Sequence, residues 1–163
     1  MKRIFAQLVV VTSLAFSFTL TSIVPAQAIT VNFSWQGNQG YSATGTFHYD
    51  EKKAADIISE KGGGETKGLD KFTVSFYDPS NQNIIDYDNI SNGVLMGDYF
   101  QFNLNTINQK NFGSIDIGGE SSGDMYLKGT VDTRLSLIQV SASGAEEIVD
   151  SNFGAIVVQS PVN

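Results

Sequence analysis

The sequence predicts an all-β, single-domain protein, an antiparallel β-sandwich (jelly-roll-like or a flattened barrel) of about nine strands. Three observations lead to this prediction. Short runs of residues alternate between apolar and polar with a period of two, clusters rich in glycine, asparagine and aspartate separate these runs, and almost nothing repeats with a helical period. No internal repeat and no low-complexity linker divides the chain, so we expect one domain.

Residues 31–50 give the clearest pattern, that of a β-hairpin. Val31, Phe33 and Trp35 alternate with polar residues in the first arm, and Phe47 and Tyr49 do so in the second. Residues 36–40, which connect the arms, include two glycines and an asparagine. This connector is too long for a two-residue turn and predicts a longer hairpin loop.

The same alternation predicts strands over residues 69–78, 83–87, 99–105, 112–117, 125–131, 135–142, 146–149 and 154–158. Residues 51–68 are expected to form a long connection with one helical turn capped by Asp50, and residues 88–97 a loop. The apolar phase changes between Leu137 and Ile138, which predicts a β-bulge. The side chains expected to meet in the core are Phe33, Trp35, Phe47, Phe72, Phe76, Phe100, Phe102, Leu127 and Leu137.

The first 28 residues have the pattern of a secretory signal peptide. Lys2 and Arg3 precede a mostly apolar run over residues 4–18, and small residues precede a cleavage site after Ala28. We therefore expect a secreted or periplasmic protein whose mature part is the β-sandwich domain of residues 29–163. No later stretch is long and apolar enough to predict a membrane span.

Charge and cysteine content exclude several classes of function. The chain has a net charge of −7 and no cysteine. An acidic surface repels nucleic acid and anionic lipid, so we expect neither as a partner. Thiolate metal sites, iron–sulfur clusters and cysteine catalysis are ruled out, and an exported domain without disulfides depends on packing for its stability.

Several segments resemble a group of secreted cyanobacterial proteins of unknown function, some of which carry a C-terminal PEP-CTERM sorting tail. The resemblance lies in Phe33-Ser34-Trp35, residues 40–47, residues 74–79 and residues 152–158, and it covers most of the expected mature chain. It implies an exported bacterial β-protein. The sorting tail itself is not found here, which implies release rather than surface sorting. The resemblance provides no catalytic residues.

Two patterns associated with catalysis are better explained as ordinary structure. Residues 119–123 match the G-x-S-x-G nucleophile elbow, but a β-pattern follows them and the only histidine, His48, precedes them. We interpret this segment as a turn between strands. His48 is expected on the polar face of its strand, and a hydrolase using His48 with a carboxylate is the alternative.

Two runs of aspartate, asparagine and glycine are weak candidates for calcium binding, because Ca²⁺ takes hard oxygen ligands from carboxylates and carbonyls. One contains Asp116, Glu120 and Asp124, and the other contains Asp86 and Asp88. Neither fits the EF-hand pattern. The competing interpretation is hairpin turns, which favour the same residue types for backbone reasons.

Tyrosines on a sandwich face can stack on sugar rings, which makes Tyr41, Tyr77, Tyr99 and Tyr126 weak candidates for ligand binding. Cross-strand aromatic pairing is the competing interpretation. Together these observations predict a non-enzymatic protein of the cell envelope or extracellular matrix. We expect a structural or carbohydrate-binding module, with an extracellular polysaccharide or another envelope protein as partner and no cofactor other than calcium. A calcium-stabilised adhesion protein is a further alternative.

Overall fold

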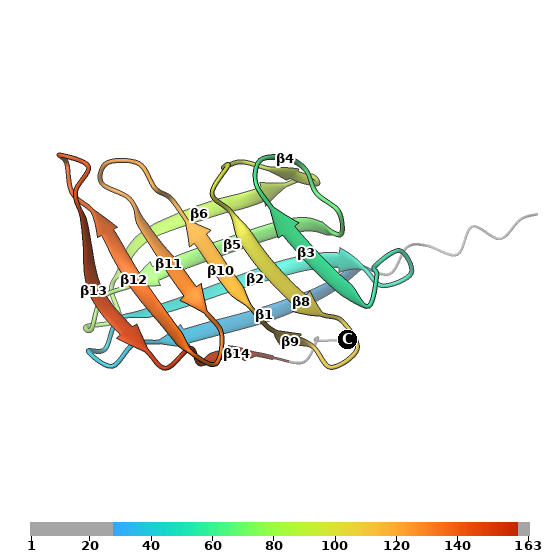
Figure 1. The fold of residues 1–163 in the computed structure, drawn as a ribbon, viewed down its shortest axis with the longest axis horizontal. Helices are drawn as coiled ribbons and strands as arrows, with labels where there is room; N and C mark the ends of the chain where they lie inside the picture. Colours follow the sequence, from blue (N-terminus) through green and yellow to red (C-terminus); the bar gives the residue numbers. More distant parts are fainter. Residues whose placement is uncertain (1–27, 160–163) are drawn as a thin grey trace, which may run out of the picture.

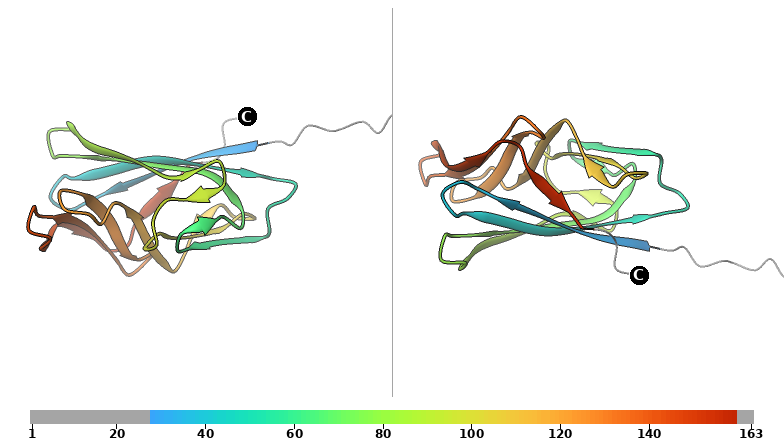
Figure 2. Two further views of the ribbon diagram at one scale, coloured as in Figure 1. Left: turned by 90° about the horizontal axis from the view of Figure 1, so that it is seen from above. Right: turned by 90° about the horizontal axis from the view of Figure 1, so that it is seen from below.

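The computed structural model describes residues 28–159, which form fourteen β-strands and no helix. The strands build two antiparallel sheets that face each other and do not close into a barrel (Figures 1 and 2). We call these sheets A and B, and the strands of sheet B cross those of sheet A obliquely (Figure 1). The all-β sandwich predicted from the sequence is confirmed, in its open form.

Sheet A contains the first hairpin and the last strand. Its strand order is β14 (Ile156–Val158), β1 (Ala28–Gln36), β2 (Ser42–Asp50), β5 (Leu69–Tyr77), β6 (Asn83–Ser91), β7 (Val94–Leu95) and β4 (Gly64–Glu65). Sheet B has the order β13 (Glu146–Asn152), β12 (Arg134–Val140), β11 (Met125–Thr130), β10 (Ser114–Gly118), β8 (Gln101–Asn105) and β3 (Ile57–Lys61). The short β9 (Lys110–Asn111) pairs with β8 outside this order.

The core lies between the sheets and is dominated by phenylalanine. Phe72 stands at its centre, with ring centroids 5.3 Å from Phe33, 5.2 Å from Phe100 and 4.9 Å from Phe102. Tilted and edge-to-face pairs of this kind add to the stability that burial of the rings provides. All nine side chains expected in the core are buried there.

The first hairpin and the bulge confirm the sequence-based predictions. β1 and β2 pair over their full length, and the loop of residues 37–41 has the expected length. The pairing of β12 with β13 shifts between Leu137 and Ile138, so that Val149 of β13 has no opposite residue. The pairing of β12 with β11 is uninterrupted, which means that Leu137 faces inward and Ile138 outward.

Two expected connections are wrong. Residues 57–61 form β3 of sheet B, and the chain makes only a turn at residues 51–53, where Asp50 accepts a hydrogen bond from the backbone N–H of Lys52. Residues 88–91 continue β6, and Val94–Leu95 is β7. The short strands β3, β4, β7 and β9 account for most of the difference between fourteen strands and about nine, since two to five residues carry little periodicity.

Buried carboxylates join the two sheets. Asp150 of β13 is 1% exposed and accepts hydrogen bonds from the backbone N–H groups of Gln39 and Tyr41 in the β1–β2 loop, and from that of Ser151. A Cβ atom at Gly37 would overlap the Asp150 carboxylate, so this loop position requires glycine. Asp150 thus holds the sheet A hairpin against sheet B.

Glu60 makes the equivalent contact at the other end. It lies on β3 of sheet B, is 1% exposed, and accepts hydrogen bonds from the backbone N–H groups of Lys67, Gly68 and Leu69 at the start of β5. Hydrogen bonds to a charged acceptor contribute more than neutral ones, about 1.5–3 kcal/mol each. These two carboxylates link the sheets in a chain that has no cysteine.

The predicted signal peptide lies almost entirely outside the described residues. Ala28, the last residue of that prediction, is the first residue of β1 and stands opposite Asp50. No helix suited to crossing a membrane occurs within residues 28–159.

Candidate functional site

The outer face of sheet B carries two parallel rows of side chains, set by the register of its strands. The first row crosses six strands and is polar, with Lys61, Gln101, Asp116, Lys128, Ser136 and Ser151 as successive cross-strand neighbours. The second row lies two residues from the first on β11 and β12 and, because of the extra residue Val149, three residues from it on β13. It contains Tyr126, Ile138 and Ile148, and is largely apolar.

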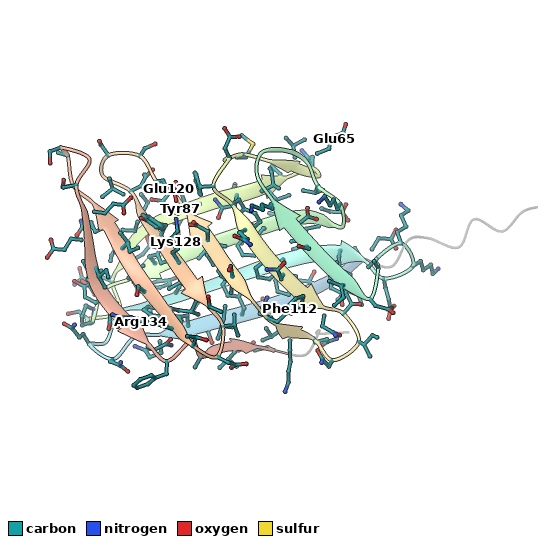
Figure 3. All side chains as sticks on the ribbon, in the orientation of Figure 1. Glu65, Tyr87, Phe112, Glu120, Lys128 and Arg134 are labelled. Atoms are coloured by element: carbon teal, nitrogen blue, oxygen red, sulfur yellow. The ribbon has the colours of Figure 1, made fainter. Side chains whose placement is uncertain are left out.

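Lys128 is the centre of the polar row. Its Nζ atom lies 2.7 Å from Oδ2 of Asp116, 3.4 Å from Oε1 of Glu120 and 5.5 Å from the centre of the Tyr126 ring. Glu120 belongs to the β10–β11 turn, so a turn residue completes a cluster that two strands begin. Figure 3 shows Lys128 and Glu120 over this part of sheet B. We call Asp116, Glu120, Tyr126 and Lys128 the Lys128 cluster.

Within the Lys128 cluster, Asp116 is the residue whose negative charge is least well stabilised by its surroundings. It is 5% exposed, and its Oδ1 atom is buried without a hydrogen-bond partner. Burial raises the pKa of Asp116 from 3.8 to about 6, and the neighbouring Glu120 adds to this rise while Lys128 opposes it. A buried carboxylate oxygen without a donor is costly, so the charged form of Asp116 is poorly stabilised at this position.

Tyr126 is more buried than the sequence suggested. Its side chain is 1% exposed, although it lies on the outer face of the sheet. Burial, together with the Glu146 carboxylate, raises the pKa of its hydroxyl to about 12. The ring therefore packs against the Lys128 ammonium and is not free to stack on a sugar. This corrects the expectation that Tyr126 is part of an exposed aromatic face.

The other candidate tyrosines do not join Tyr126 in one face. The Tyr99 hydroxyl donates to the backbone carbonyl of Gly118 at 2.7 Å, and its pKa is raised chiefly by burial. The Tyr87 hydroxyl accepts from the backbone N–H of Met125 at 2.9 Å. Tyr99 thus ties the turn before β8 to β10, and Tyr87 ties β6 to β11. Tyr41 and Tyr77 are half-buried near the ends of β2 and β5 in sheet A.

The calcium candidates are divided between the two sheets. Asp116 and Glu120 meet at Lys128, whereas the Asp124 carboxylate accepts the backbone N–H of Ser121 and closes its own turn. Asp86 and Asp88 are exposed on β6, within a strand rather than the expected loop. Across residues 28–159, no group of three or more histidine, aspartate or glutamate side chains is placed to hold a metal ion.

Neither catalytic pattern acquires a partner within the described part of the chain. Residues 119–124 form the β10–β11 turn and β11 follows, which confirms the interpretation of the G-x-S-x-G match as a turn. His48 lies half-buried on β2, with Nδ1 at 3.4 Å from Oγ1 of Thr30 and with Lys71 opposite it on β5. No carboxylate forms an ion pair with His48 in residues 28–159.

Lys128 is the residue of the cluster that sequence reasoning missed. The outward orientation of Lys128 could be predicted from the sequence, because Lys128 lies between the inward-facing Leu127 and Gly129. What the sequence does not give is the register that places Lys128 opposite Asp116. That register depends on the β10–β11 turn, whose length also brings Glu120 to the same ammonium.

Comparison with known proteins does not assign the chain to a family. No protein-family model, no curated protein and no solved structure matches the chain.

Proposed function

We propose that this is an exported, non-enzymatic module of the cell envelope or extracellular matrix that binds a neutral polysaccharide on the outer face of sheet B. One observation carries the proposal: Lys128, whose side chain is 50% exposed, and Glu120, whose side chain is 29% exposed, stand on an open sheet face beside Asp116, a buried carboxylate whose Oδ1 atom has no hydrogen-bond donor. The signal-peptide pattern and the resemblance to secreted cyanobacterial proteins support the export part of the proposal.

The two rows of the face suit the chemistry of a sugar chain. A sugar ring presents hydroxyl groups at its edge and C–H groups on its flat sides. The polar row offers the Lys128 ammonium as donor and carboxylate oxygens as acceptors, while Ile138 and the 55%-exposed Ile148 offer apolar surface alongside. A chain laid across the strands would meet both kinds of group.

The charge of the protein favours a neutral polymer. The net charge is −7, and two of the three charged side chains in the Lys128 cluster are acidic. An anionic polysaccharide would be repelled. A neutral sugar hydroxyl can donate to the partly exposed Glu120 carboxylate and accept from Lys128 without introducing another charge.

The non-enzymatic part of the proposal is supported by how the Lys128 cluster is arranged. Asp116 and Glu120 both contact the Lys128 ammonium, which takes the place between the two carboxyl groups that the scissile bond would need in two-carboxylate glycoside hydrolysis. The alternative hydrolase would depend on His48, which lies on the opposite sheet.

Affinity electrophoresis in native gels containing soluble neutral glucans, mannans or xylans tests the proposal. We expect at least one neutral polymer to retard the protein, and Asp116→Asn or Lys128→Met to remove the retardation. Asp88→Asn is the matched control, because it makes the same charge change on an exposed position of sheet A. Absence of retardation in every neutral polymer, or equal retardation of Asp116→Asn, would overturn the proposal.

The calcium-stabilised adhesion protein is tested by thermal unfolding in chelator and in calcium. A ligand that binds only the folded state raises the midpoint by mass action. A rise in calcium that Asp116→Asn removes would favour calcium over sugar as the occupant of the Lys128 cluster. An unchanged midpoint, together with retardation in a neutral polymer, would favour the polysaccharide.

A further inference from the structure

Phe153 is the most exposed large apolar side chain in the described part of the chain, with 85% of its surface exposed. It follows β13 and lies two residues beyond Ser151 of the polar row, so it faces outward from sheet B. Asn152, which lies between them, points inward and donates to a backbone carbonyl of β1 in sheet A. The N–H of Asp132 donates to the carbonyl of Gly154, which holds this ring beside the β11–β12 turn.

Phe112 is a second exposed ring on the same face. It lies between β9 and β10, is 39% exposed, and donates its backbone N–H to the carbonyl of Asn103 at 3.4 Å. Asn111, the residue before it, is buried, so by alternation Phe112 faces outward. Phe112 and Arg134 lie along the lower part of sheet B, below Lys128 (Figure 3).

Three exposed side chains connect the two rings and form a third row on sheet B. Ser114 stands opposite Thr130, and Thr130 stands opposite Arg134. Each of the three lies two residues from the polar row along its own strand, on the side away from the apolar row. We call these residues, together with Phe112 and Phe153 at the two ends, the Phe112–Phe153 row.

The guanidinium of Arg134 has donors to spare. Its Nη2 group donates to the Ser151 hydroxyl at 3.4 Å, and Arg134 forms no ion pair within residues 28–159. A guanidinium carries five N–H donors in a planar fork. Two neighbouring hydroxyl oxygens of a sugar ring can accept from such a fork, so Arg134 offers a second polar contact beside that of Lys128.

We propose that the polysaccharide lies over the polar row and the Phe112–Phe153 row together, with a sugar ring stacked on each phenylalanine and two neighbouring hydroxyls held by Arg134. This inference rests on the proposed polysaccharide binding and names the class of polymer. That class is an unbranched chain of neutral sugars with flat C–H faces, such as a β-linked glucan or xylan. The flat faces pack on the two rings, and the hydroxyls at the ring edges reach Ser114, Thr130 and Arg134.

The length of the row sets the length of the ligand. From β10 to β13 the row crosses three strand spacings of about 4.8 Å, which is about 14 Å in all. A chain of several sugars spans this distance, whereas a disaccharide reaches one ring at a time. Joining two weak contacts through one ligand raises the affinity without any new contact.

The arrangement of the row argues against a protein as the occupant. A protein–protein interface has a contiguous apolar centre and a polar rim. Here the rings stand at the two ends and hydroxyl groups occupy the middle, with β11 and β12 between them. The net charge of −7 disfavours an anionic polymer, although Arg134 is the one charged side chain of the row.

The first experiment compares the purified full chain with two variants of Phe153, by affinity electrophoresis in soluble β-glucan and xylan. We expect Phe153→Ala to bind about tenfold more weakly, because part of a ring face is no longer covered, and Phe153→Tyr to bind like the wild type. Met96→Ala is the matched control, since it removes a 68%-exposed apolar side chain next to β7 of sheet A. Thermal unfolding confirms that each variant is folded.

The second experiment tests the middle of the row and the length of the ligand. Arg134→Lys keeps the charge and removes the planar fork, and we expect about tenfold weaker binding. In calorimetry, a hexasaccharide of the β-linked glucan should bind at least tenfold more tightly than the disaccharide. Phe153→Ala should reduce this difference, and so should Phe112→Ala.

The outcomes separate this inference from the proposed function. Retardation of the wild type that Asp116→Asn abolishes, but that Phe153→Ala and Arg134→Lys leave unchanged, would keep polysaccharide binding and overturn the role of the row. No retardation of the wild type in any neutral polymer would overturn both. Stronger retardation in polygalacturonate than in neutral polymers would overturn the neutral class. Self-association in sedimentation that Phe153→Ala abolishes would make the row an interface between two copies instead.

Discussion

Asp150 and Asp116 are both buried aspartates of sheet B, yet their surroundings differ in one decisive respect. The two oxygens of Asp150 accept four hydrogen bonds, donated by the backbone N–H groups of Gln39, Tyr41 and Ser151. Asp116 has a single strong contact, from Lys128 to Oδ2, and its Oδ1 has none. Asp150 faces the opposite sheet, whereas Asp116 faces outward.

The difference shows how burial of a charge can serve structure in one place and binding in another. A saturated carboxylate holds backbone groups that would otherwise be left without partners, and it stabilises the fold. An incompletely bonded carboxylate weakens the fold, and a ligand that binds beside it and alters its charged neighbours can reduce that cost. Glu60 belongs with Asp150, and the Lys128 cluster is the exception.

The largest expected effect is loss of the Asp150 contact. Asp150→Ala leaves the N–H groups of Gln39 and Tyr41 without acceptors at a buried position, so we expect the free energy of unfolding to fall by about 3–5 kcal/mol. Chemical denaturation measures it. A loss below about 1 kcal/mol would mean that Asp150 contributes no more to stability than an exposed carboxylate does, and the contrast with Asp116 would not hold.

A smaller loss is expected for Glu60→Gln. The glutamine carbonyl can still accept from Gly68 and Leu69, but its amide group faces the N–H of Lys67, which both glutamate oxygens now accept. We expect a loss of about 1–2 kcal/mol by chemical denaturation. Glu65→Gln, an exposed position on β4, is the control and should stay unchanged. Equal stability of Glu60→Gln and wild type would show that charge is unimportant in this contact.

Removing the charge of Asp116 should act in the opposite direction. Its pKa is about 6 in the folded state and 3.8 in its ordinary state, so the folded protein binds more protons between these values. Stability from this group is therefore full below pH 4 and is lost as pH rises to about 6. At neutral pH, Asp116→Asn should gain about 1 kcal/mol, once solvent screening at the sheet face is allowed for.

The measurement for Asp116 is denaturation of wild type and Asp116→Asn from pH 4 to 7. The two curves should separate as pH rises, with the variant more stable above pH 6. Asp88→Asn, exposed on β6, should run parallel to wild type. A variant that loses stability at neutral pH would mean that Asp116 resembles Asp150.

The smallest expected effect is at His48. This side chain lies half-buried on β2, away from the Lys128 cluster, and its Nδ1 atom lies 3.4 Å from Oγ1 of Thr30. We expect His48→Ala to change the free energy of unfolding by less than about 0.5 kcal/mol and to leave polysaccharide retardation intact. Loss of retardation, or of any hydrolytic activity found in the wild type, would favour the alternative site at His48.

The sequence predicted what depends on local alternation and missed what depends on register. The β1–β2 hairpin and the phenylalanine core follow from the order of apolar residues along single strands. The register shift falls at Leu137 and Ile138 as predicted, but its extra residue, Val149, belongs to the neighbouring strand β13. β3 was missed because Glu60 occupies an inward position and disguises its alternation. A buried glutamate can be recognised as a core residue only when the three backbone N–H groups that donate to it are known.

The candidate site was predicted in part for the same reason. Asp116 and Glu120 were singled out with Asp124, but as ligands of a cation in a turn. Pairing of β10 with β11 instead sets Lys128 opposite Asp116, and this ammonium occupies the position between the two carboxylates. Tyr126 was chosen as an exposed ring, and its burial depends on neighbours from β12 and β13 that no single strand reveals.

The most direct test of the central claim is a titration of the Asp116 carboxyl carbon by NMR, with and without a neutral polysaccharide that retards the protein. We predict a pKa near 6 for the free protein. We expect it to fall when the polymer is bound, because a hydroxyl that hydrogen-bonds the Glu120 carboxylate weakens the repulsion by which Glu120 raises the pKa of Asp116. A pKa near 4 in the free protein, or one that the polymer leaves unchanged, would contradict the account of Asp116 as an incompletely bonded carboxylate at the binding site.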